Sequence, residues 1–150
     1  MNRARELADS IIHRYLSLTR YQRRLNERIR MSTNVSGRQL AVLRFLVQDG
    51  PHSVGRISRY LYVRDATTSA LLDRMERNGY VTRRRSTEDC RKVIVEPTEL
   101  GREIAATAPA GTTYLLRTRL PEVDVEELER IDRALARLSE IAEVDESTLD

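Results

Sequence analysis

The sequence is poor in the residues that build metal sites and covalent cross-links. Its 150 residues contain one cysteine and two histidines. Cys90 alone cannot form an intramolecular disulfide, so we expect a chain that works in the cytoplasm. His13 and His52 have no further ligands at metal-site spacing around them, so neither a metal nor another cofactor is expected.

Catalytic machinery and membrane segments are also lacking. A lone cysteine, two separated histidines and the absence of a glycine-rich phosphate loop give no assembled chemistry, so we expect no enzyme activity. No apolar run approaches the ~20 residues that span a bilayer. Glu6 and Asp9 interrupt the opening stretch MNRARELADSII, which is therefore not expected to be a secretory signal. Charged residues at 33% and hydrophobic residues at 40% indicate a soluble globular domain.

Positive charge is unevenly distributed along the chain. Residues 120–150 hold eleven acids and three bases, a net charge of −8. Residues 1–119 hold 23 bases and 12 acids, a net charge of +11. A basic body favours a polyanionic partner, and we expect the acidic segment to face away from that partner.

Apolar periodicity predicts a mostly helical chain. The first helix, residues 4–30, lacks Gly and Pro and would be about 40 Å long at 1.5 Å per residue. Such a helix is too long for a small domain to cover by itself. Its apolar stripe comprises Leu7, Ile11, Leu18, Leu25 and Ile29. Further helices are expected over residues 37–48, 55–62, 66–78, 98–104, 112–119 and 124–144.

Capping and breaking residues give these helices their limits. Ser36 with Gln39 fits a capping box at the start of the second helix. Asp65 is the expected N-cap of the helix over residues 66–78, and Gly79 its stop. Pro109 and Gly111 predict a kink or a break between the helix capped by Thr98 and the one that follows.

A helix-turn-helix over residues 53–77, followed by a charged hairpin, has the element order of a winged helix. The N-terminal residues of the second helix of such a pair can reach base edges in a major groove. An alternative is that the hydroxyl residues there merely cap a helix. The candidate DNA contacts on this helix are Arg64, Ala66, Thr67, Thr68, Ser69 and Arg74.

The hairpin itself, GYVTRRRSTEDCRKVIVEP, carries an excess of positive charge at its tip. Residues 83–92 contain five bases and two acids. Such a tip can contact phosphates and place an arginine in a narrow minor groove. The alternative is a solvated tip whose charges only protect a strand edge. The candidate contacts are Arg83, Arg84, Arg85, Arg91 and Lys92, with Asp89 placed to orient the Arg91 guanidinium by a salt bridge.

The run SVGRISRYLYVRDATTSALLDRMERNGYVTRRRSTEDCRKVIVEPTELGRE resembles the MarR family of bacterial regulators. The resemblance is clearest in LLDRMERNGYVTR, in the D-x-R-K-V of the hairpin and in the T-x-x-G after it. It implies a mostly α (α+β) fold, a winged helix-turn-helix with long N- and C-terminal dimerisation helices. In this division residues 1–150 form a single domain, with a DNA-binding lobe over 36–97, a helix-turn-helix at about 53–77, a wing over 80–96 and dimerisation regions over 1–35 and 98–150.

The resemblance also implies a function, a sequence-specific regulator that binds a palindromic operator in double-stranded DNA as a homodimer and represses transcription. Arg91 would enter the minor groove, with Asp89 holding it. One candidate release signal is a small-molecule effector in a pocket between the lobe and the dimerisation helices. The position of Cys90 between Asp89 and Arg91 suggests oxidation of its thiol as a second, and the alternative is a passive surface cysteine. The alternative is a winged helix that makes only protein contacts. The expected dimer contacts are Leu7, Ile11, Leu18, Leu128, Leu135 and Leu138.

Overall fold

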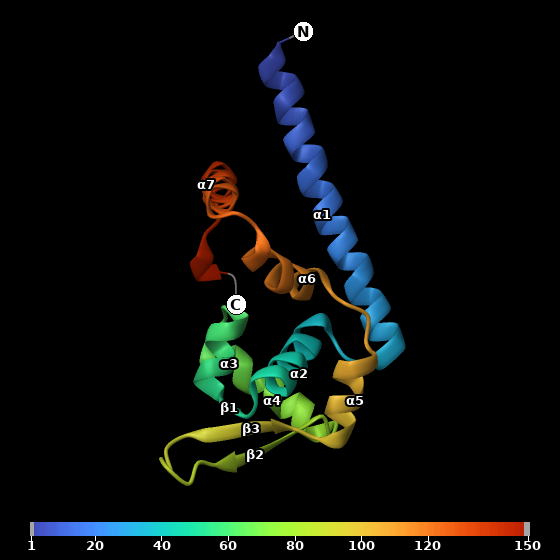
Figure 1. The fold of residues 1–150 in the computed structure, drawn as a ribbon, viewed down its shortest axis with the longest axis vertical. Helices are drawn as coiled ribbons and strands as arrows, with labels where there is room; N and C mark the ends of the chain where they lie inside the picture. The colour runs from blue at the N-terminus through green and yellow to red at the C-terminus, as the bar shows by residue number, and fades with distance from the viewer. Residues whose placement is uncertain (1, 149–150) are drawn as a thin grey trace.

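The computed structural model describes residues 2–148, so the ends of the expected single domain, residues 1 and 149–150, lie outside the described part. Helix α1 forms a rod that extends beyond the rest of the chain, while α2 to α5 and a small sheet gather around its C-terminal end (Figure 1). Helices α6 and α7 lie above this lower lobe, beside the rod. The rod is α1 (Arg3–Thr33), and the elements of the lobe are α2 (Gly37–Asp49), β1 (His52–Ser53), α3 (Val54–Leu61), α4 (Asp65–Arg77), β2 (Val81–Arg85), β3 (Val93–Pro97) and α5 (Glu99–Thr107). Those that follow are α6 (Thr112–Arg119), η1 (Leu120–Glu122), α7 (Val125–Ile141) and η2 (Glu146–Thr148).

Helix α1 is the long helix that the sequence predicts, and it is longer at its C-terminal end than residues 4–30. Asn2 caps its start, since the Asn2 side chain accepts a hydrogen bond from the Ala4 N–H at 3.1 Å. Asn34 ends it in the left-handed region, with φ of 61°. Residues 31–33 therefore continue the helix for about one more turn than the sequence predicts.

The expected capping box of α2 is confirmed. The Ser36 hydroxyl accepts from the Gln39 N–H at 3.1 Å, and the Gln39 side chain accepts from the Ser36 N–H at 2.9 Å. The start of α4 differs from the expectation, because Arg64 and not Asp65 is the N-cap, and no side chain among residues 2–148 caps the helix there. Asp65 instead lies in the first turn, where a carboxylate interacts favourably with the helix dipole. Gly79 follows α4 with φ of 77°, as a helix stop requires.

The three strands form an antiparallel sheet in the order β1-β3-β2. The hairpin pairs Val81 with Pro97 at its base and Arg85 with Val93 near its tip. Pro97 is the last residue of β3, a position where its missing N–H costs no ladder hydrogen bond. The hairpin extends sideways from the lobe as a wing (Figure 1).

The T-x-x-G motif joins the wing to α5. The Thr98 hydroxyl accepts from the Gly101 N–H at 3.1 Å, and the Thr98 N–H donates to the Tyr80 carbonyl at 3.0 Å. A Cβ on Gly101 would lie 2.2 Å from the Tyr80 carbonyl oxygen and 3.0 Å from Leu43. Glycine is therefore required here because α5 packs directly on the backbone that precedes β2.

The break that Pro109 and Gly111 predict is present between α5 and α6. Arg44 of α2 donates hydrogen bonds to the carbonyls of Ala108 at 2.7 Å and Pro109 at 3.2 Å. Backbone groups that the break leaves without helical partners are thereby satisfied. The break is held in place by the lobe.

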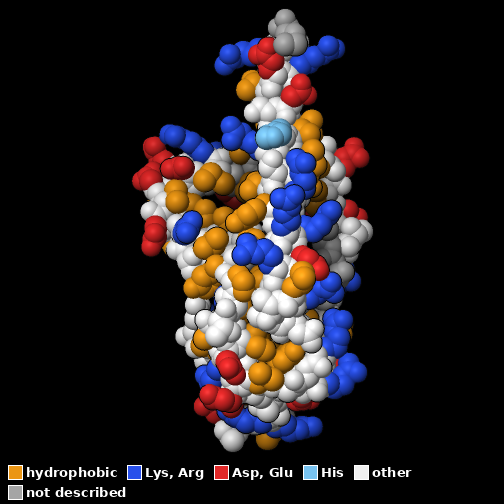
Figure 2. All heavy atoms as spheres, turned by 90° about the vertical axis from the view of Figure 1, so that its right-hand side faces the viewer, with side chains coloured by type: hydrophobic (Ala, Val, Ile, Leu, Met, Phe, Trp, Pro, Cys, Tyr) orange, Lys and Arg blue, Asp and Glu red, His pale blue; other side chains and the backbone are white. Residues whose placement is uncertain are grey.

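The hydrophobic core lies in the lobe, and α1 contributes to it only through its lower end. Leu25 and Ile29 of α1 are buried at 5% and 1% exposure, whereas no residue of α6 or α7 is buried. Hydrophobic side chains are exposed on both sides of the upper part of α1 (Figure 2). None of the helices within residues 2–148 combines the length and apolar composition needed to cross a membrane.

Candidate nucleic-acid interface

Helix α4 has one face in the core and the other in solvent. Leu71, Leu72 and Met75 pack inward, as the sequence predicts. Ala66 and Ala70 are exposed, as are Asp73 and Arg74 one turn further on. The outward face begins with small side chains, so its first turns can approach another molecule closely.

Thr68 is a correction to the expected DNA contacts. Its side chain is fully buried, and its hydroxyl lies 2.9 Å from that of Ser58 on α3. The hydroxyl pair ties the two helices of the helix-turn-helix together. Thr67 and Ser69, its neighbours, are half-buried and keep part of their surface in solvent.

Arg64 lies at the start of α4, where the sequence places it, and is exposed. Its guanidinium donates a hydrogen bond to the carbonyl of Ser147 at 3.0 Å. The C-terminal segment η2 therefore reaches the beginning of the helix that the sequence singles out for DNA. Sequence reasoning gave no sign of this contact, because the two residues are 83 positions apart.

Arg83 lies at the base of the wing and braces it against α4. Its Nη2 donates to the carboxylates of Asp73 at 2.6 Å and Glu76 at 3.0 Å. The hydrogen bond from Arg83 lowers the pKa of Glu76 below its ordinary value, and the same bond raises the pKa of Arg83. Arg83 was expected to contact DNA, but its charge is matched within the chain, and its contacts fix the angle between wing and helix.

The other wing cations divide into two groups. Arg84 donates to Glu96 across the ladder at 2.8 Å, and Arg85 donates to the Cys90 carbonyl at 3.2 Å. Arg91 and Lys92 are exposed at the tip. The charge that the wing presents to a partner is therefore smaller than the sequence suggests.

Asp89 has a different role from the expected salt bridge. Its carboxylate accepts from the backbone N–H of Arg91 at 3.1 Å, and among residues 2–148 it forms no ion pair with the Arg91 guanidinium. The Lys92 N–H donates to the Asp89 carbonyl at 2.9 Å, so Asp89 shapes the turn. Cys90 is exposed beside it, as expected for a tip residue.

A second basic surface was not foreseen from the sequence. A groove of about 590 Å³ runs between α1, the start of α2 and α4. Arg23, Arg30 and Arg38 line it together with Arg74, the one member of the group that the sequence singled out. The four arginines come from three helices that are separated in the sequence, so no local sequence pattern indicates that they lie together.

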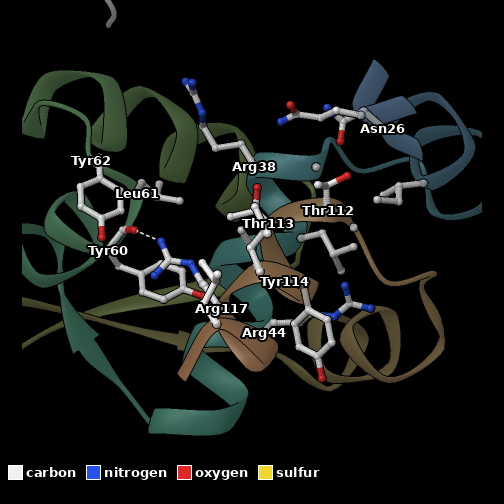
Figure 3. Close-up of a pocket in the computed structure, with 18 of the residues that line it drawn as sticks. Asn26, Arg38, Arg44, Tyr60, Leu61, Tyr62, Thr112, Thr113, Tyr114 and Arg117 are labelled. Carbon is white, nitrogen blue, oxygen red and sulfur yellow. Dashed lines mark hydrogen bonds between the residues drawn. The ribbon is translucent and has the colours of Figure 1, made fainter. Parts of the chain in front are cut away.

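A pocket of about 670 Å³ lies between the lobe and the upper helices, where the family resemblance implies one (Figure 3). Arg117 of α6 stacks 3.7 Å above the Tyr60 ring, and Arg44 lies 4.6 Å from the centre of the Tyr114 ring. Burial raises the pKa of Tyr60 and lowers the pKa of Arg44. The Thr112 hydroxyl and the Arg117 Nε, both at this pocket, are buried without a hydrogen-bond partner in the described structure. The pocket thus combines aromatic walls with unused polar groups.

Comparison with protein families and curated sequences gives three matches. The model of the MarR family matches residues 35–93. The chain is 31% identical over 113 residues to an uncharacterized HTH-type transcriptional regulator, YfiV of Bacillus subtilis, a match that covers 75% of this chain and 71% of the relative. It is 35% identical over 68 residues to the organic hydroperoxide resistance transcriptional regulator of the same organism, with coverage of 45% and 46%.

Solved structures share the fold over most of their length. The transcriptional regulator BldR from Sulfolobus solfataricus matches with a TM-score of 0.62 and 27% identity, covering 91% of this chain and 99% of BldR. Reduced AbfR bound to DNA matches with a TM-score of 0.60 and 24% identity, covering 91% and 99%. A mutant MarR from E. coli complexed with operator DNA matches with a TM-score of 0.62 and 19% identity, covering 92% and 99%.

Proposed function

This chain belongs to the MarR family of transcriptional regulators, and from that premise we propose that it is a repressor that binds a palindromic operator as a homodimer. The observation that carries the proposal is the wing, which Arg83 fixes to α4 through Asp73 and Glu76. A recognition helix and a wing that are rigidly joined can contact one duplex together. Family and fold are those of regulators and not of enzymes.

The proposed reading surface is the start of α4. Arg64 and the side chains of Thr67 and Ser69 are the candidates for base edges and phosphates, and Ala66 leaves room for close approach. Arg91 and Lys92 at the wing tip are the candidates for the adjacent minor groove and backbone. AbfR and the E. coli MarR were solved with DNA on the same fold, which supports this arrangement.

The proposed dimer covers the apolar surface that the chain leaves open. Leu7, Ile11 and Leu18 on α1 are 53%, 49% and 64% exposed, and Leu135 on α7 is 57% exposed. Leu128 and Leu138 are half-buried on the same helix. A large exposed apolar surface on a chain of this size favours a protein partner, and a second copy offers the same two stripes.

The pocket at Tyr60 and Arg117 is the proposed effector site. A ligand there would touch both α6 and the end of α3. Its binding would therefore change the position of the lobe relative to α6 and α7. Oxidation of Cys90, exposed in the wing, is the second candidate signal. Either signal would act by changing the fit of two lobes to successive major grooves about 34 Å apart.

Selection of bound fragments from a random duplex pool tests the proposal. We expect two-fold symmetric sites with half-sites about one helical turn apart, and binding that weakens steeply with salt. The alternative, a winged helix that contacts only proteins, predicts no enriched sequence and weak association that salt hardly changes.

A further inference from the structure

The groove between α1, the start of α2 and α4 is rich in arginine. Arg23 and Arg30 come from α1, Arg38 from α2 and Arg74 from α4, while Glu27 is the single acid among the lining residues. We call this surface the arginine groove. Four cations from three helices against one anion give it a net positive charge.

The arginine groove and the wing lie on opposite flanks of α4. Glu76 holds the wing through Arg83, and Arg74 lines the groove. At 3.6 residues per turn, two residues that are two positions apart point in directions roughly 160° apart. The exposed face of α4 that starts at Ala66 therefore lies between a basic wing on one side and the arginine groove on the other.

The groove cations are less neutralised than those at the base of the wing. Arg30 pairs with Glu27 at 3.0 Å. The side chains of Arg23, Arg38 and Arg74 are exposed. Within residues 2–148 their guanidinium groups form no salt bridge or hydrogen bond. Arg38 also lines the aromatic pocket, but in Figure 3 its side chain extends away from Arg117 and the Tyr60 ring.

The backbone holds the arginines of α1 and α2 side by side. A Cβ on Gly37 would lie 2.5 Å from the Asn26 side-chain oxygen, so the start of α2 packs closely against α1. A Cβ at this position would displace the Asn26 amide, which also lines the groove. The start of α2, at Ser36 and Gly37, also lines the groove, and the N-terminus of a helix favours a negatively charged partner.

A recognition helix in a major groove has a phosphate strand along each flank. The wing is placed to contact the strand on one flank. We propose that the arginine groove binds the phosphates of the strand on the other flank, through Arg23, Arg38 and Arg74. This inference rests on the proposed function, and it adds Arg23 and Arg38 to the DNA contacts.

The test compares two double variants that remove the same charge. Arg23→Ala with Arg38→Ala removes two groove cations, and Arg24→Ala with Arg28→Ala removes two exposed cations from the opposite face of α1. Operator affinity is measured at several salt concentrations for both and for the unmodified protein. Each operator binds two protomers, so loss of two phosphate contacts per protomer should reduce the salt slope by about 3.6, since each contact contributes about 0.9. The control variant should change the slope by less than half as much.

Phosphate ethylation interference on the same operator locates the contacts. We expect interference at phosphates on the wing side and on the opposite flank of each half-site, and loss of only the latter in the groove variant. Equal slopes and unchanged interference in the groove variant would overturn the inference and leave DNA binding in place. Failure of the unmodified protein to bind any duplex would instead overturn the proposed function.

A small phosphorylated anion is the other ligand that the arginine groove would bind through the same contacts. Calorimetry with inorganic pyrophosphate, without DNA, distinguishes the two. Weak or absent binding supports a surface that follows a phosphate backbone. Tight binding that Arg38→Ala abolishes, combined with an unchanged salt slope, identifies a small-anion site and overturns the DNA assignment. Thermal melting of both double variants should match that of the unmodified protein, because all four side chains are exposed.

Discussion

Arg117 lies with its guanidinium 3.7 Å above the centre of the Tyr60 ring and donates a hydrogen bond to the Tyr60 carbonyl. Tyr60 stacks on Phe45 at 4.0 Å, and Phe45 stacks on His52 at 4.6 Å. The stack therefore joins α6 to the end of α3 and to β1, the strand beside the wing hairpin. It is a direct physical connection between the upper helices and the lobe.

Replacement of Arg117 by Met should weaken this connection. We expect a loss of about 1–2 kcal/mol in the free energy of unfolding, from the cation–π contact and the hydrogen bond together. Urea unfolding measures the loss. Arg119→Met, an exposed position on the same helix, is the control and should change stability by less than ~0.5 kcal/mol. Equal stabilities of the two variants would show that the stack is incidental.

Arg91→Ala tests the wing tip. The exposed Arg91 guanidinium is expected to contact DNA, so its loss should weaken binding to most operators. Because a dimer carries two wings, the salt slope should fall by about 1.8. Fluorescence anisotropy over a salt series measures both effects. Arg84→Ala is the control, because Arg84 is paired with Glu96 and should contribute less. An unchanged affinity and slope for Arg91→Ala would mean that the tip does not touch DNA.

Glu76 makes stability depend on pH in a defined direction. Arg83 lowers the pKa of Glu76 in the folded protein from its ordinary value of 4.5, so the ionised form is favoured by folding. That contribution is complete above the ordinary pKa and is lost as pH falls through the folded pKa. Glu76→Gln should therefore lower the melting temperature at pH 7, and the difference from the unmodified protein should shrink as pH falls below about 4.5. Glu88→Gln, at the wing tip, serves as the control, and a pH-independent difference for Glu76→Gln would contradict the assignment.

Thr68 and Ser69 are adjacent, but substitution of Thr68 should lower stability and substitution of Ser69 should weaken operator binding. Thr68→Val removes a buried hydroxyl that pairs with Ser58, and we expect it to cost about 1 kcal/mol of stability without changing operator preference. Ser69→Ala should leave stability within ~0.5 kcal/mol and weaken operator binding. Thermal melting and a binding assay on both variants check the pair. A change of operator preference in Thr68→Val would restore Thr68 to the reading surface.

Leu135→Glu tests the proposed dimer. Leu135 is exposed on the apolar side of α7, where a carboxylate buried against a second copy would carry a large desolvation cost. Sedimentation should show a monomer for this variant and a dimer for the unmodified protein. Ala136→Glu adds the same charge on the charged side of α7 and should leave the dimer intact. An intact dimer with Leu135→Glu would remove α7 from the interface.

Features fixed by neighbouring residues were predictable from the sequence. The capping box at Ser36, the stop at Gly79 and the break at Pro109 depend on a few residues in a row, and all three are present. The element order of the winged helix followed from the helix-turn-helix over residues 53–77 and the charged hairpin after it. The extra turn of α1, residues 31–33, was missed because the residue that ends this helix is Asn34.

Features that depend on residues brought together by the fold were not predictable. The pairs of Arg83 with Glu76 and of Arg64 with Ser147 join separate elements, so no spacing in the sequence indicates them. Thr68 looked like a surface hydroxyl because its partner Ser58 lies on another helix. For the wing, counting bases overestimated the free charge, since cross-strand and helix partners were invisible in the sequence.

The upper half of α1 has a consequence for how the molecule withstands dilution. Leu25 and Ile29 anchor its lower end, but Leu7 and Ile11 are exposed and lie outside the core that residues 2–148 form. If a second copy supplies that missing surface, the resistance of the rod to heat rises with protein concentration, while the lobe keeps a fixed melting point. At low protein concentration the rod would then be the first part to unfold, and dimer formation would set how firmly the two lobes are held apart.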